Sequence, residues 1–152
     1  MPHVRTDLRN GFSTLLGQID SIEGLKHFAN RVHPLAQGDY PCTIIKSGPE
    51  RIEPGTKNRI QNSPQKRYIT TEVYGFVRAN ESLEDVADNL ILAIEKVVFS
   101  DPTIGGIADS TSLTEIIPHF TGSPNAPTEA VLMRFVSIVW TMEGTPEKSF
   151  SN

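Results

Sequence analysis

The sequence predicts an α+β fold, a single domain in which a mostly antiparallel sheet of about four strands packs with two or three helices. Three segments carry this prediction: residues 67–78 alternate as a strand, residues 82–98 carry a helical apolar stripe, and residues 130–143 are apolar at nearly every position. A chain of 152 residues fits one domain with a proper core. We assign that domain to residues 1–143.

The first expected helix covers residues 4–19. Gly11 and Gly17 weaken it by roughly 1 kcal/mol each relative to alanine, so it depends on packing against the rest of the domain. Its apolar stripe has members three or four residues apart, namely Val4, Leu8, Phe12, Leu15, Leu16 and Ile19. Residues 24–32 fit either a short helix or an irregular turn.

The first expected strand is short and covers residues 41–46, because Thr43, Ile44 and Ile45 are all β-branched. Residues 67–78 form a longer strand with two different faces. The better core candidate is the face of Ile69, Thr71, Val73, Gly75 and Val77. The other face mixes aromatic and polar groups, which suits contact with a helix or another subunit, and carries Tyr68, Thr70, Glu72, Tyr74 and Phe76.

The second expected helix begins at Ser82. Ser82 and Asp85 have the spacing of a capping box, in which hydroxyl and carboxylate each accept a backbone amide. Pro102 ends this helix, and Gly105-Gly106 supplies a tight reversal of the backbone. The apolar stripe is continuous and consists of Leu83, Val86, Ala87, Leu90, Ile91, Ile94, Val97 and Val98.

Two further strands are expected at residues 110–117 and 130–143. The last of these is apolar on both alternating faces, so we expect it to be central in the sheet and covered on both sides. Residues 47–65 and 118–129 are rich in proline and break all periodicity, which predicts two long loops. Residues 144–152 are expected to form a flexible C-terminal tail.

Composition excludes several classes of protein. The net charge of −4 argues against a dedicated nucleic-acid binder, and the single Cys42 rules out an intrachain disulfide. The N-terminal residues are not followed by the apolar run of a signal peptide, and no window approaches the length of a membrane span. We therefore expect a protein that resides, or is assembled, in the cytosol.

The sequence announces no catalytic, cofactor or metal site. None of the four histidines, His3, His27, His33 and His119, pairs with another ligand type at a metal-binding spacing. Cys42 lies on a short strand among apolar neighbours, so a buried free thiol is expected. The acidic residues around Glu84 and Asp88 are explained by the positive end of the helix dipole. We predict that the protein is not an enzyme.

The candidate contact residues are basic. Lys57, Arg59, Lys66 and Arg67 lie in or just after the first long loop, and no acidic residue occurs between positions 57 and 68. One interpretation is a solvated, mobile loop. The other is a charged arm that contacts a partner protein or nucleic acid, although the absence of interleaved aromatic residues speaks against stacking on single strands.

The order of motifs resembles the tail terminator, or minor tail, proteins of long-tailed bacteriophages. The resemblance spans roughly residues 4–143. It rests on Arg31-Val32 before the segment Asp39-Tyr40-Pro41-Cys42-Thr43-Ile44-Ile45, on the long strand and helix, on Asp101-Pro102-Thr103-Ile104-Gly105-Gly106, and on the apolar last strand. Neck and head–tail joining proteins are similar to the same pattern.

This resemblance implies a subunit of a six-membered ring that caps the tail tube, ends tube polymerisation and offers a surface to the head connector or neck protein. It implies a place in the virion, at the head-proximal end of the tail, after assembly in the cytoplasm of the bacterial host. Genomic DNA would pass through the lumen without sequence-specific binding. The alternatives are a connector or neck protein, a nucleic-acid-binding module that uses residues 57–67, and a small enzyme or ligand-binding domain with a polar pocket that the sequence does not announce.

Overall fold

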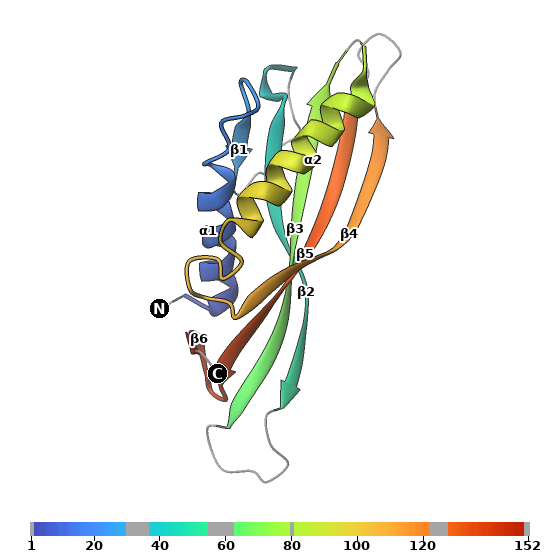
Figure 1. Cartoon of the computed structure of the whole chain (residues 1–152). Helices are drawn as coiled ribbons and strands as arrows, with labels where there is room; N and C mark the ends of the chain where they lie inside the picture. Colours follow the sequence, from blue (N-terminus) through green and yellow to red (C-terminus); the bar gives the residue numbers. More distant parts are fainter. Residues whose placement is uncertain (1, 30–36, 55–62, 80, 122–127, 151–152) are drawn as a thin grey trace.

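The computed structural model describes residues 2–29, 37–54, 63–79, 81–121 and 128–150, and they form one α+β unit (Figure 1). Its sheet has the strand order β1-β2-β3-β5-β4, with β6 paired to β5. The pair β1–β2 is parallel and all other described pairs are antiparallel. The strands are β1 (Lys26–Phe28), β2 (Cys42–Pro54), β3 (Pro64–Arg78), β4 (Ser110–Thr121), β5 (Thr128–Met142) and β6 (Thr145–Phe150).

Two α-helices, α1 (Val4–Leu16) and α2 (Leu83–Phe99), lie on the same face of the sheet (Figure 1). Their apolar stripes pack on the alternate positions of β3 and β5 that point toward them, as predicted for Ile69, Val73 and Val77. The fully buried aromatic rings of Phe12 and Phe135 meet in this layer at a centroid distance of 5.7 Å. A short 3₁₀ helix, η1 (Gln37–Asp39), precedes β2.

The α+β class, the mostly antiparallel sheet and the two helices are as predicted, whereas the number of strands is not. The described residues contain a sheet of six strands where about four were expected. The ambiguous segment 24–32 contains the short strand β1, which is neither of the forms expected for it. The expected flexible tail contains β6, which pairs with the end of β5 that β4 leaves free.

The described residues of both predicted long loops are almost all strand. β2 continues through residues 47–54 as the outer partner of β3, and β4 continues through Pro118 to Thr121 along β5. Proline is tolerated here because Pro49 lies within the register shift between Ser47 and Glu50, and Pro118 lies on an edge strand. The hairpin of β2 and β3 therefore extends well beyond the helical layer (Figure 1).

The prediction that the last strand is central is confirmed, but the prediction that it is covered on both faces is wrong. The odd-numbered residues of β5 from Glu129 to Thr141 are buried, whereas the even-numbered ones are only half-buried. No described helix covers that second face (Figure 1). The apolar side chains Leu132, Val136 and Ile138 therefore belong to an open sheet face, which explains why their pattern looked like two-sided burial.

The predicted capping box is also wrong. Ser82 adopts a left-handed conformation with φ 55°, and its side chain makes no capping hydrogen bond. The turn after α2 forms as predicted, and the carboxylate of Asp101 accepts hydrogen bonds from the Thr103 hydroxyl and amide and from the Gly105 amide. These bonds lower the pKa of Asp101, with the Thr103 hydroxyl as the main cause.

Gly11 has a packing role that explains its place inside α1. An added Cβ would lie 2.7 Å from Cγ2 of Ile104, which is fully buried and has a positive φ of 49°. The Ile104 side chain of the turn 101–106 thus packs directly on the backbone of α1 at Gly11, and only glycine leaves room for it there.

Candidate functional site

The structure separates the four basic residues predicted as a contact set. Lys57 and Arg59 lie outside the described residues. Lys66 and Arg67 are neighbours on β3, so their side chains point to opposite faces of the sheet. Arg67 faces the helical side and is 7% exposed, whereas Lys66 lies on the open face.

Arg67 is a structural residue that holds the hairpin. Its guanidinium donates to Glu50 Oε1 at 2.7 Å, to Thr141 Oγ1 at 2.8 Å and to Gln65 Oε1 at 3.4 Å. Arg5 of α1 lies 3.6 Å from the other oxygen of Glu50. This cluster ties β2, β3, β5 and α1 together where the hairpin leaves the helical layer, and it removes Arg67 from any partner-contacting surface.

The open face next to Lys66 carries aromatic rings under cations. The Arg51 guanidinium carbon lies 4.1 Å from the centroid of the Tyr68 ring, and Lys66 Nζ lies 5.1 Å from that ring and 5.9 Å from the ring of Trp140. The hydrogen bond with Tyr68 raises the pKa of Lys66. The sequence suggested no interleaving of basic and aromatic residues, because the strand pairing brings Arg51 and Trp140 to Lys66 from far along the chain.

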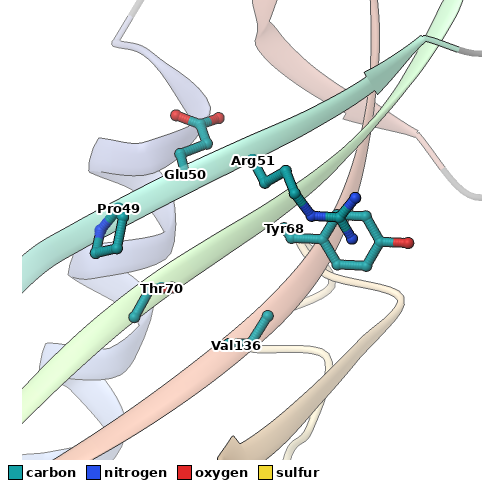
Figure 2. Close-up of a pocket in the computed structure, with 6 residues that line it drawn as sticks. All are labelled: Pro49, Glu50, Arg51, Tyr68, Thr70 and Val136. Carbon is teal, nitrogen blue, oxygen red and sulfur yellow. The ribbon is translucent and has the colours of Figure 1, made fainter.

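A shallow pocket of about 330 Å³ lies beside these rings (Figure 2). Figure 2 shows the Arg51 guanidinium over the Tyr68 ring, with Thr70 on the same strand as Tyr68 and Val136 on β5. Pro49 and Glu50 complete the lining. Two polar groups of the lining are engaged within the chain, since Glu50 accepts from Arg67 and Tyr68 donates to Glu53.

A row of charges crosses the open face between two apolar regions. We define the charged row as Lys46, Glu72, Arg134 and Glu115, which are successive cross-strand partners on β2, β3, β5 and β4. Arg134 donates to Glu72 at 3.0 Å and to Glu115 at 2.6 Å, and these bonds raise its pKa. Lys46 Nζ lies 5.4 Å from the centroid of the Tyr74 ring. Signs alternate along the row from one strand to the next.

The regions on either side of the charged row are apolar or aromatic. On one side the cross-strand partners Ile44, Tyr74, Leu132 and Ile117 form a second row, with Phe76 stacked on Tyr74 at 6.4 Å. Burial, followed by the nearby Glu72, raises the pKa of Tyr74. On the other side lie Tyr68, Ile138 and Trp140, the last in contact with the ring of Phe150. A two-sided apolar surface of this kind is typical of a protein contact.

Two of the histidines are held by local hydrogen bonds. His3 Nδ1 accepts from the Arg5 amide at the start of α1, and His27 Nδ1 lies 2.8 Å from the Thr43 hydroxyl, with burial lowering the pKa of His27. Cys42 is buried and takes part in no disulfide, as predicted. Within the described ranges no group of three histidine, cysteine or acidic residues could hold a metal ion, and no helix is long and apolar enough to cross a membrane. His33 lies outside the described residues.

Glu129 is a buried carboxyl at the start of β5, with 4% exposure. Among the residues that the structure describes, its Oε2 has no hydrogen-bond partner. Burial raises the pKa of Glu129, and the carboxylates of Glu84 and Asp88 on α2 raise it further. Folding therefore shifts the protonation equilibrium of this carboxyl toward its neutral form, relative to the unfolded chain.

Comparison with known proteins gives distant structural likenesses alone. No family model matches the chain, and no curated protein sequence matches it. Among solved structures, a chain from the "Virion of native gene transfer agent (GTA) particle" is similar with a TM-score of 0.38 and 10% sequence identity, over 90% of this chain and 92% of that one. A likeness at this level carries no argument about function, so the candidate surfaces are interpreted from their own geometry.

Proposed function

We propose that the chain is a virion structural subunit and, more specifically, a tail terminator of a long-tailed bacteriophage. In this proposal about six copies form a ring at the head-proximal end of the tail, cap the tube and end its polymerisation. The ring then presents a surface to the head connector or neck protein. DNA passes through the lumen without sequence-specific contacts, and assembly takes place in the host cytoplasm.

The observation that carries the proposal is the hairpin of β2 and β3. It extends beyond the helices and is anchored by the buried cluster around Arg67 and Glu50. Its outer strand is exposed from Arg51 to Pro54 and includes Ile52, which is 45% exposed. A rigid arm with an exposed strand edge and an apolar side chain suits pairing with a neighbouring subunit. The order of motifs in the sequence supports the same assignment.

The nucleic-acid-binding alternative ranks second. The structure describes two of its four basic residues. Arg67 is buried in an ion pair with Glu50, whereas Lys66 lies on the open face. Glu53 and Glu72 lie among the cations of that face, because Tyr68 donates to Glu53 and Arg134 to Glu72. A surface with nearly balanced charge attracts a phosphate backbone weakly.

The test removes part of the segment that connects β2 to β3 in the sequence. A variant lacking residues 56–62 keeps all described pairs of the hairpin, so it should fold with an unchanged circular dichroism spectrum. We expect the wild-type chain, alone or mixed with the tube subunit from the same genome, to form rings of about 100 kDa, six times the 16.8 kDa chain. The deletion variant should form none. Ring formation at wild-type efficiency by the variant would contradict the role of the hairpin as an assembly arm.

A further inference from the structure

The alternating signs of the charged row make the open face self-complementary. The midline of the row lies between β3 and β5. Lys46 and Glu115 lie at equal distances from it at the two ends, Glu72 and Arg134 lie at equal distances inside, and each of these two pairs has opposite signs. A two-fold axis that runs along the strands, in the plane of the contact, would place β2 over β4 of a second copy and β3 over β5. Every charge in the row would then face its opposite.

We propose that the open face binds a second copy of this chain, as a face-to-face two-fold dimer. Lys46 lies over the partner's Glu115, and Glu72 lies over the partner's Arg134. A two-fold axis across the strands would instead place each charged residue over the same residue of the partner, so that like charges would meet. The charge pattern therefore selects the first orientation. Packing with strands nearly aligned is a common arrangement for two stacked sheets.

The apolar rows agree with the same axis. Because this axis keeps each row opposite itself, Tyr74 meets the partner's Leu132 and Tyr68 meets the partner's Ile138. Ile117, which is 37% exposed, lies opposite the partner's Ile44, but Ile44 is itself 7% exposed and adds little contact. Apolar cover on the two sides of the charged row therefore comes mainly from Tyr74 with Leu132 and from Tyr68 with Ile138.

The size of the face predicts a weak dimer. Four strands spaced about 4.8 Å apart, over roughly eight residues of each strand, give about 500 Å² per copy and about 1,000 Å² in total. That area lies at the low end for specific contacts, so we expect association at micromolar or weaker affinity. The charges mainly select the orientation, since Arg134 already has partners within its own chain.

The two ends of the row allow a test by charge reversal, in which Lys46→Glu leaves the bonds of Arg134 intact and Glu115→Lys removes one of them. Lys46 and Glu115 are three strand spacings apart, about 14 Å, so they do not pair with each other in one copy. Lys46→Glu places a carboxylate over the partner's Glu115, and Glu115→Lys places an ammonium over the partner's Lys46. Each single variant should lose dimerisation, whereas an equimolar mixture of the two should form a heterodimer in which both end pairs have opposite signs.

The measurement is sedimentation velocity over a concentration series at low and moderate salt, with thermal unfolding to show that both variants fold. The wild type should show a species of twice 16.8 kDa that weakens as salt rises. Each variant alone should bind itself at least about tenfold more weakly, and the mixture should recover wild-type affinity or better. A wild type that stays monomeric, a variant that dimerises like the wild type, or a mixture that does not associate would each overturn the proposal.

This dimer does not rest on the ring proposal, and mass separates the two. A dimer has two copies and uses the open face, whereas the ring has about six and is tested by the hairpin deletion. Rings that form equally in wild type and Lys46→Glu, with no dimer in either, would support the ring and overturn the dimer. Binding of a short single-stranded oligonucleotide to the face without self-association would likewise overturn it.

Discussion

The buried pair of Arg67 and Glu50 offers the sharpest test of how the hairpin is held. Glu50→Ala leaves the guanidinium of Arg67, which is 7% exposed, without its charged partner at 2.7 Å. Thr141 and Gln65 remain, but both are neutral acceptors. Since an unpaired buried charge costs more than the pair contributes, the loss should exceed that of an ordinary hydrogen bond.

We expect Glu50→Ala to lower the free energy of unfolding by about 3 kcal/mol, the low end for breaking a buried pair because the Glu50 side chain keeps 12% exposure. For a domain of this size that corresponds to a drop in Tm of roughly 6–12 °C. Replacing both residues together, as Glu50→Leu with Arg67→Met, should recover much of the loss, because no buried charge is then left unpaired.

The assay is urea unfolding followed by circular dichroism, with Glu53→Ala as the matched control. Glu53 lies three residues further along β2 and accepts a hydrogen bond from Tyr68, but it is exposed. Its removal should cost less than about 1 kcal/mol. If Glu50→Ala costs no more than Glu53→Ala, the cluster does not anchor the hairpin and the reasoning is refuted.

Two further substitutions test the packing of α1 and the burial of a carboxyl. Gly11→Ala should destabilise the fold by about 1–2 kcal/mol in thermal unfolding, because overpacking against Ile104 outweighs the gain in helix propensity. The control Gly17→Ala should be neutral or stabilising, because a Cβ at Gly17 meets only ordinary van der Waals contacts. Equal effects of the two substitutions would contradict the close packing of Ile104 on Gly11. Glu129→Gln should raise Tm at pH 8 and have little effect near pH 4. Because the pKa of Glu129 is raised in the folded protein, the wild type loses stability as pH rises from the unfolded-state pKa to the folded-state pKa. Glutamine does not ionise, so the variant avoids this loss. A difference in Tm that is independent of pH would contradict that reasoning.

The sequence predicted the helix-facing side of the sheet well, because there periodicity and burial have one cause. Ile69, Val73 and Val77 alternate with polar or aromatic residues, and the helices that cover them have matching stripes. The turn at 101–106 was equally readable, since Asp101 and the two glycines act through neighbouring residues.

The sequence failed where pairing across the sheet decides the outcome. The segment from Ser47 to Pro54 looks like a loop, but it is held as a strand by β3 and accommodates Pro49 in a register shift. β5 looks covered on both faces because its open face is nearly as apolar as its buried one. For the candidate site, charge spacing along the chain grouped Lys66 with Arg67, although alternation on β3 sends them to opposite faces.

The charged row could not be predicted, because its four members come from four strands and meet only through register. Lys46 and Glu115 are far apart in the chain, and a shift of one residue in any strand would break the alternation. The Ser82 prediction failed for a local reason, since a left-handed residue at the start of α2 directs its side chain away from the helix amides.

The most direct test of the central claim is the length of tail tubes made without this protein. We would place a stop codon early in its gene, produce particles in the bacterial host and measure tubes by negative-stain microscopy, with the gene supplied in trans as the control. A tail terminator predicts tubes of uncontrolled length that are not joined to heads, and restoration of uniform tails in the control. Tails of normal length attached to heads in the mutant would contradict the account.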